Sequence, residues 1–366
     1  MLSTDKRWKE LGEVLTHYCL DVQPGQKVMI AQYEVETWPL ALATYESVIK
    51  AGGFPQIQLK SEYLRRAFMK YGTKEQYSWE PEIEMMSMDW ADCYIALRGG
   101  YNLDIYHDIP ADVLAANQGA HGVVSANRTR KTRWSLTRVP NAAFAQQAGM
   151  DIETITDMYF NACLLDYDTA MKKWEGWAKK LQGTSEVHLT GKKTDLHLSI
   201  KGRIWSTPAA RGNMPGAETE IPPVVPSING HIYFENPGVL GGRLMHDMYL
   251  EWKNGELVKA TASTNEDYLH KIIATDEGSS KIGEFAIGFN DQLTTFTNDI
   301  LWDEKMYGTI HIALGRAYAR GGGKNDSAIH WDIIKDMRQE GELVIDGMTI
   351  LKDGHLQFES ISQKRR

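Results

Sequence analysis

The spacing of apolar residues changes near residue 183, and this change limits the folds open to the chain. Before it, stretches with apolar residues three or four positions apart alternate with short apolar runs, as helices and buried strands do. After it, segments such as 194–200 alternate every second residue, which is typical of half-buried strands. We therefore expect an α/β domain over residues 1–182 and a β-rich α+β domain over 183–366, because 366 residues suffice for two cores.

The first domain is expected to contain a largely parallel sheet. The pattern predicts helices and strands in alternation, with helices over 6–20, 37–51 and 151–182 and strands over 27–31, 54–59 and 92–97. Gly52-Gly53 ends the second helix, since glycine readily takes the left-handed conformation found there. Strands separated by helices imply βαβ units and a Rossmann-like layout. No GxGxxG follows the first strand, so this layout does not by itself indicate a dinucleotide site.

The second domain carries two hairpin signals. Asn254-Gly255 joins two alternating runs over 249–258, and Asp346-Gly347 joins two short apolar runs near the end of the chain. Both dipeptides favour the tight turns that match the twist of paired strands. Further strands are expected over 185–190 and 194–200.

Composition excludes several classes of protein. A formal net charge of −8 and the lack of a basic cluster outside the last residues argue against a nucleic-acid partner. The three cysteines lie far apart without a CxxC pair, which favours a reducing compartment. No signal peptide and no apolar run long enough for a bilayer is present. We expect a cytoplasmic protein with no membrane partner.

Carboxylates recur at unusual places in the second domain. Glu218 and Glu220 lie in a Pro/Gly-rich segment, 213–220, that reads as a loop. Glu284 stands inside an otherwise apolar strand between two glycines, where a charge must be paired or bound to a metal to offset its desolvation. Asp303-Glu304 closes the apolar turn 300–302.

Two histidines accompany them. His311 lies within the apolar run 309–315, and by itself such a residue is usually a satisfied core histidine. His330 and Asp332 are two residues apart, so in a strand both side chains point to the same face and can reach one cation. Imidazoles and carboxylates together suit zinc, manganese, cobalt or iron. Four or more carboxylates exceed what one zinc ion needs, which makes a pair of ions plausible.

These motifs, in this order, resemble the M29 aminopeptidases of the aminopeptidase T and S type. The resemblance rests on an Asn-Met-Pro loop with a downstream glutamate, a Gly-Glu strand, an Asp-Glu turn, a His-Ile-Ala-Leu-Gly strand and a His-x-Asp strand, over residues 205–335. Two details differ: the loop reads Met-Pro-Gly-Ala-Glu, and the connection from Glu304 to His311 is longer than in familiar members.

The resemblance implies a set of site residues. The metal ligands would be Glu218, Glu284, Glu304, His311, His330 and Asp332. Tyr318 would line the site and donate to the oxyanion, and Glu220 is our candidate for the general base. Arg316 could face a substrate carboxylate or could equally be a solvated charge.

The resemblance also implies an activity. We expect a homodimer in which each chain holds two divalent ions, chosen from zinc, cobalt, manganese and magnesium. They would activate a water that cleaves N-terminal residues from short peptides or splits small amides. Two alternatives stay open: a ring-cleaving dioxygenase on the same scaffold, with one iron on His311, His330 and Asp332, and a binding module without activity.

Overall fold

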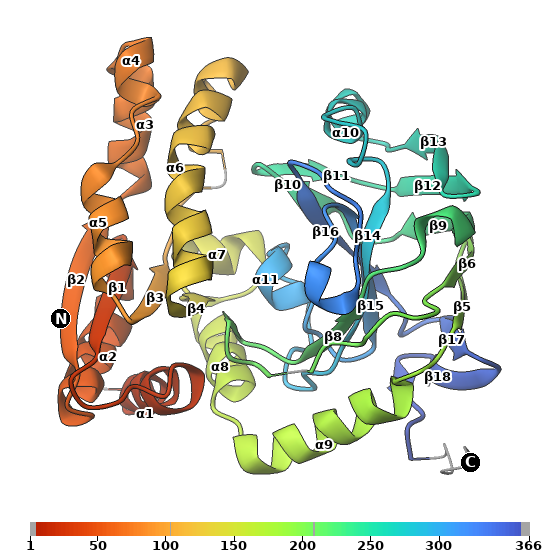
Figure 1. The fold of residues 1–366 in the computed structure, drawn as a ribbon, viewed down its shortest axis with the longest axis horizontal. Helices are drawn as coiled ribbons and strands as arrows, with labels where there is room; N and C mark the ends of the chain where they lie inside the picture. The colour runs from red at the N-terminus through yellow and green to blue at the C-terminus, as the bar shows by residue number, and fades with distance from the viewer. Residues whose placement is uncertain (1–4, 103, 208, 360–366) are drawn as a thin grey trace. The chain divides into compact units, whose positions relative to one another are not determined.

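The computed structural model describes residues 5–102, 104–207 and 209–359 (Figure 1). By their contacts, the described residues up to Leu164 together with Ala210–Pro215 form one compact unit. Those from Leu165 to Ala209 and from Gly216 onward form the other. The contacts group helix α9 (Tyr167–Leu181) with the second unit, whereas the boundary predicted near residue 183 follows this helix.

The first unit is built on a five-stranded sheet in which all neighbours run parallel. Its order is β2 (Phe54–Lys60), β1 (Lys27–Tyr33), β3 (Cys93–Arg98), β4 (Arg133–Arg138) and β7 (Asn213–Met214). The three predicted strands of this half are confirmed, and so is the α/β class. The sequence pattern missed β4 and β7.

Helices connect these strands. They are α1 (Arg7–Glu13), the π-helix η1 (Val14–Cys19), the 3₁₀ turn η2 (Val35–Thr37), α2 (Trp38–Lys50), α3 (Glu62–Tyr71), α4 (Lys74–Tyr77), α5 (Glu82–Trp90), α6 (Ala111–Lys131), α7 (Ala142–Gln147) and α8 (Ile152–Cys163). Side chains of α5 and α6, such as Met88 and Val124, pack on the sheet face that bears Met29 and Ala31.

No helix among the described residues is both long and apolar enough to cross a membrane.

The prediction that residues 151–182 are helical is confirmed, and the stretch is divided into two helices, α8 and α9. The side chain of Asp166 accepts a hydrogen bond from the backbone N–H of Thr169 at 3.2 Å and so begins the second helix. Periodic apolar spacing continues across the break, which is why the pattern alone did not reveal it.

An eight-stranded antiparallel sheet forms a large part of the second unit. Its order is β13 (Glu256–Thr261), β12 (Met248–Lys253), β9 (Asn229–Phe234), β6 (Thr194–Ser199), β5 (Glu186–Gly191), β17 (Glu342–Ile345), β18 (Met348–Lys352) and β19 (His355–Leu356). Both predicted hairpins are confirmed. Asn254 and Gly255 have φ of 51° and 82°, as a tight two-residue turn requires.

A second, four-stranded antiparallel sheet carries the candidate site residues, and its order is β16 (His330–Asp336), β15 (Thr309–Gly315), β14 (Ile282–Gly288) and β8 (Glu218–Ile221). The remaining elements of the unit are η3 (Val225–Ser227), β10 (Gly238–Leu240), β11 (Arg243–Met245), α10 (Glu266–Ile273), α11 (Ile300–Asp303) and η4 (Ala319–Gly321). The prediction that 213–220 is a loop is wrong in part, because Glu218 and Glu220 lie on β8. Ladder pairing with β14 outweighed the turn-forming tendency of the Pro/Gly sequence before it.

Candidate metal centre

The four-stranded sheet has one apolar face and one charged face. Phe285, Ile287 and Ile312 alternate along the strands with the charged positions and are fully buried. On the other face, strand register fixes which side chains meet, since residues opposite each other in a ladder point the same way. Glu284, His311 and Asp332 lie on strands, as expected, and the register of these strands directs their side chains to this face.

Small residues stand beside these long side chains in the ladder. Ala286 lies between Glu220 and His311, and Ala313 lies between Glu284 and Asp332. Glycines are opposite the other two members, Gly288 facing Glu218 and Gly315 facing His330. The alternation therefore leaves room on this face for carboxylates and imidazoles to converge.

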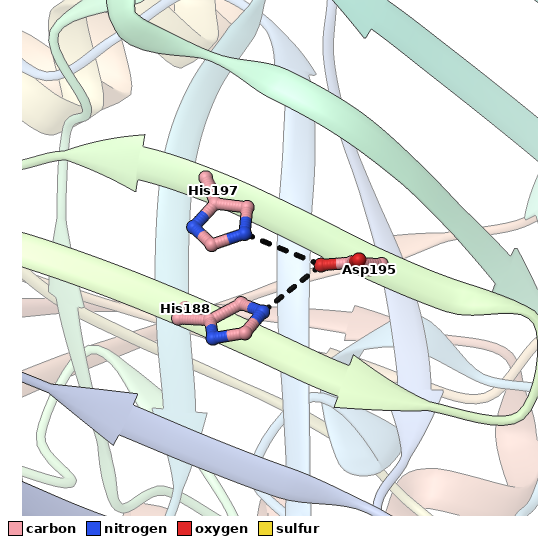
Figure 2. A group of neighbouring side chains, drawn as sticks. All are labelled: His188, Asp195 and His197. Carbon is pink, nitrogen blue, oxygen red and sulfur yellow. Dashed lines mark hydrogen bonds and ion pairs between the residues drawn. The ribbon is translucent and has the colours of Figure 1, made fainter.

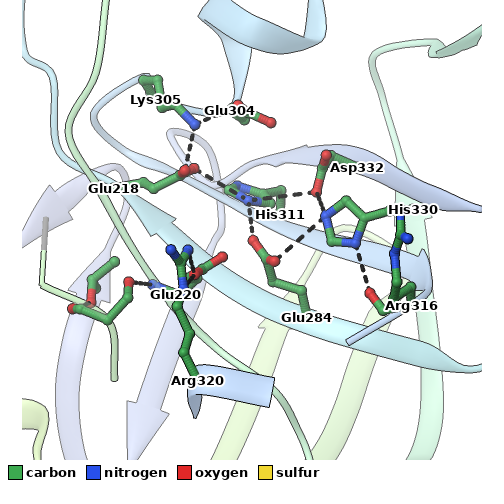
Figure 3. A network of polar contacts seen from close by, with 12 residues as sticks. Glu218, Glu220, Glu284, Glu304, Lys305, His311, Arg316, Arg320, His330 and Asp332 are labelled. Atoms are coloured by element: carbon green, nitrogen blue, oxygen red, sulfur yellow. Dashed lines mark hydrogen bonds and ion pairs between the residues drawn. The ribbon is translucent and has the colours of Figure 1, made fainter. Parts of the chain in front are cut away.

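His311 is at the centre of the group (Figure 3). Its Nε2 lies 3.3 Å from Glu284 Oε1, 3.5 Å from Glu218 Oε2 and 3.9 Å from Asp332 Oδ1. Two sets of donor atoms that could each hold one ion share this histidine. One set is Glu218, Glu304 and His311, called position A below, and the other is Glu284, His311 and Asp332, called position B.

His330 adjoins position B. Its Nε2 lies 3.5 Å from both Glu284 Oε2 and Asp332 Oδ1, and its Nδ1–H donates to the backbone carbonyl of Arg316 at 2.7 Å. This bond orients the ring so that Nε2 points at the carboxylates, as the hydrogen bond of a metal-binding histidine does. Burial lowers the pKa of His330, but the Asp332 and Glu284 carboxylates outweigh it and raise the pKa to about 10. The backbone carbonyl of Arg316 thus orients the His330 ring.

Glu304 reaches the group from outside the sheet, at the end of α11. Gly288 permits this approach, since a Cβ there would lie 2.1 Å from the carbonyl oxygen of Met306. The neighbouring Asp303 turns away and accepts from both the N–H and the hydroxyl of Thr297, each at 2.8 Å. Of the acidic pair, only Glu304 therefore joins the site.

Lys305 is a site residue that the sequence reasoning missed. Its ammonium is ion-paired with Glu218 Oε1 and with Glu304 Oε1 (Figure 3). The side chain is 2% exposed, although lysine is almost never buried unless it is paired. Its position directly after Glu304, beside an apolar turn, was the available signal.

Glu220 and Tyr318 lie at the margin of the group. The guanidinium of Arg320 is ion-paired with Glu220, and Nε of Arg320 donates to Oε1 at 3.0 Å. Burial raises the pKa of Glu220, but a hydrogen bond from Glu284 and the charge of Arg320 hold the pKa below its usual value. The ring of Tyr318 lies 4.9 Å from the ring of His330, and 42% of this tyrosine is exposed. It follows strand β15, which ends at Gly315.

The donor set fits a divalent cation. Five carboxylates, those of Glu218, Glu220, Glu284, Glu304 and Asp332, outnumber the three cationic side chains that pair with them, Lys305, Arg320 and His330. Some buried donor atoms have no hydrogen-bond partner among the described residues: Glu218 Oε2, Glu284 Oε2, Asp332 Oδ1 and His311 Nδ1. Buried oxygens without partners are costly, and an ion coordinated by oxygen and nitrogen would satisfy the oxygens.

A separate group is exposed on the eight-stranded sheet (Figure 2). His188 on β5 and His197 on β6 are opposite in the ladder, with ring centroids 3.8 Å apart. Their Nε2 atoms lie 2.9 Å and 3.3 Å from Asp195 Oδ1. Two imidazoles and a carboxylate can also take up a transition-metal ion. Metal counts on this protein must therefore allow for this group.

The fold and the buried donor set are those of a candidate metalloenzyme, and comparison with known proteins gives its family. The model of the family described as thermophilic metalloprotease (M29) matches residues 4–356. The chain belongs to this M29 metallopeptidase family, and it is a peptidase-type hydrolase.

Curated aminopeptidases are similar to this chain, one over nearly its whole length and one over about half of it. Aminopeptidase 2 of Geobacillus stearothermophilus is 24% identical over 95% of this chain and 96% of its own. Aminopeptidase T of Thermus aquaticus is 27% identical over 56% of each chain.

Two solved structures share the fold. AmpT from Thermus thermophilus superposes with a TM-score of 0.86 at 19% identity, covering 97% of this chain and 100% of the other. A 2,5-dihydroxypyridine dioxygenase from Pseudomonas putida does so with a TM-score of 0.61 at 12% identity, covering 97% and 98%. At these identities the likeness establishes the fold alone.

Proposed function

We propose that the protein is an aminopeptidase that removes N-terminal residues from short peptides or splits small amides with the help of two divalent ions. The observation that carries the proposal is the buried convergence of carboxylate oxygens on His311 Nε2. The names of the M29 relatives support the substrate class.

The proposed ligands follow the two donor sets. Position B would use Glu284, His311 and Asp332, with His330 completing it. Position A would use Glu218 and Glu304; His311 belongs to both sets, and because its Nε2 has a single lone pair it would bind only one of the two ions. A mixed set of carboxylate and imidazole donors is compatible with zinc, cobalt, manganese or magnesium.

The bound ions would polarise the scissile carbonyl and bring the pKa of a water towards neutrality. The chain's own residues have the remaining roles. Glu220, buried beside Glu284 and kept ionised by Arg320, would accept the proton of that water and return it to the leaving amine. The pKa of Tyr318 is raised by burial and by the Glu284 and Asp332 carboxylates, so its hydroxyl stays protonated and can donate to the oxyanion.

An activity screen tests the proposal. The metal-reconstituted protein would be given amino-acid amides, dipeptides and small cyclic amides, with N-acetylated dipeptides as matched controls. We expect free dipeptides to be cleaved and the acetylated ones to resist, because an aminopeptidase needs a free terminal amine. Equal cleavage of both would refute the aminopeptidase proposal, and no cleavage of any amide would refute the hydrolytic site.

The dioxygenase remains the second candidate, because His311, His330 and Asp332 provide the two-histidine, one-carboxylate set that a single iron uses. The close approach of Glu284 to both histidines favours hydrolysis, since a one-iron site has no need of this carboxylate. Oxygen consumption by the iron-loaded protein with dihydroxylated aromatic substrates would favour the dioxygenase.

We also propose a cytoplasmic homodimer, as kinship with the family implies. Sedimentation of the purified protein tests the dimer, and a monomer at micromolar concentration would refute it.

A further inference from the structure

Position A already contains a positive charge. The Lys305 ammonium pairs with Glu218 and Glu304, which supply two of the three donors of this position. The side chains of Lys305, Glu304 and His311 are 2%, 8% and 1% exposed, so the pairing is screened little by water. A buried ammonium is retained only where carboxylates compensate for its lost hydration.

The two positions differ in the side chains with which their carboxylates pair. At position A, the Oε1 atoms of Glu218 and Glu304 both accept from Lys305. Glu218 Oε2 lacks a hydrogen-bond partner among the described residues, as do Glu284 Oε2 and Asp332 Oδ1 at position B. An incoming ion therefore meets at position A an ammonium already paired with both carboxylates, whereas at position B the carboxylates pair with histidines that can themselves bind the ion.

We propose that Lys305 is a built-in cation of position A, so that a divalent ion fills position B directly and reaches position A only by displacing the ammonium. This inference rests on the proposed metal centre. An ammonium and a divalent ion compete for the same two carboxylates, because like charges a few ångströms apart in a buried site repel strongly. The consequence is stepwise loading, with one ion at low metal concentration and a second only at higher concentration.

Metal titration of a charge-removing variant tests this role. All proteins would carry His188→Ala and His197→Ala, which remove the exposed group as a source of extra ions. Cobalt(II) or manganese(II) is titrated into metal-free protein, and the two dissociation constants are measured by equilibrium dialysis. In protein that keeps Lys305 we expect one tight ion and a second bound at least ~10-fold more weakly.

Lys305→Met removes the charge and keeps an apolar stem of similar length. We expect it to tighten the second ion at least ~10-fold and to leave the first unchanged. Lys305→Arg is the matched control, because it keeps the charge and should keep the two steps apart. Circular dichroism checks that each variant is folded.

A measurement on protein that keeps Lys305 guards against a variant that fails to fold. With one equivalent of manganese(II), stepwise loading gives the electron paramagnetic resonance spectrum of isolated ions. If positions A and B had equal affinity, some molecules would bind two ions, and these pairs would give a spin-coupled signal. Two ions of equal affinity in the protein with Lys305, or a second constant unaltered in Lys305→Met, would overturn the role of Lys305 and leave the metal centre standing. No bound ion in any variant would overturn the metal centre and this inference together.

Discussion

Glu284 and Asp332 face each other across a single alanine, Ala313, on the strand between theirs. Both carboxylates are nearly buried, with 5% and 13% of their side chains exposed. Burial, and then the charges of Glu220 and Asp332, raise the pKa of Glu284 well above its usual value. Two carboxylates held over so small a residue are arranged to share a cation.

Ala313 therefore sets the space for the ion. Ala313→Val adds two methyl groups between the carboxylates, and we expect it to weaken metal binding by about 10-fold or more, the scale seen when a ligand's surroundings are disturbed. Overpacking would also cost about 1–3 kcal/mol of stability. The measurement is a metal titration together with urea unfolding.

Ile312→Val is the control for this change, because Ile312 is adjacent in the chain but lies on the apolar face. It should cost about 0.5–1.5 kcal/mol and leave the metal affinity unchanged. If both variants altered metal affinity equally, the effect of Ala313→Val would come from general destabilisation and not from the crowded site.

Glu284→Gln should strongly reduce activity by removing the carboxylate nearest to His311 Nε2. We expect a fall in kcat/KM of at least about 100-fold, together with loss of the ion at position B. Glu251→Gln, on strand β12 of the other sheet, is the matched control. Undiminished activity of Glu284→Gln would contradict the two-metal proposal.

Removal of metal should lower thermal stability at neutral pH, because an ion that binds only the folded state stabilises it. At a free concentration 100 times Kd the gain is about 2.7 kcal/mol. Differential scanning calorimetry before and after chelation, and again after reconstitution, measures it. A Tm that does not respond to chelation would contradict ion binding by the folded state.

Asp276 anchors the segment that leads into β16. Its carboxylate accepts from the Ala328 N–H at 2.7 Å and from the Ser327 hydroxyl at 3.0 Å, and these bonds lower its pKa, the one to Ala328 most. A lowered pKa stabilises the folded state above the unfolded value, about 3.9, and the contribution is lost as the pH falls below it.

Asp276→Asn should therefore be less stable than the unmodified protein at pH 7, and the difference should shrink as the pH drops below about 4. Urea unfolding across this pH range provides the comparison. A difference that stayed constant with pH would show that the charge of Asp276 contributes nothing.

The local periodicity of the sequence predicted much of the site. The two-residue spacing of His330 and Asp332 placed both on one face, and Glu284 was recognised because a charge in an apolar strand needs a partner. Contacts that depend on distant segments were not predictable. The Arg316 carbonyl that orients His330 and the ammonium of Lys305 have no periodic signal, because a turn and a chain reversal bring them into place.

Strand β8 shows the same limit in the fold. Glu218 follows Met214-Pro215-Gly216-Ala217, which reads as a turn, and only the ladder with β14 makes 218–221 a strand. The local signal for a loop was correct for 215–217, whereas Asn213–Met214 forms strand β7. The long-range pairing that extends the sheet to include Glu218 and Glu220 could not be read from the sequence.

Five of the six proposed ligands project from one hydrogen-bonded sheet, and only Glu304 comes from a turn. The backbone that holds these five is complete without any ion, since ladder bonds and the apolar face maintain it. Metal exchange in this protein should accordingly be a matter of side chains alone, so that ions can leave and be replaced by others while the chain remains folded. The metal ions available around the folded protein would then decide which metal it carries, and the ion present while the chain folded would not.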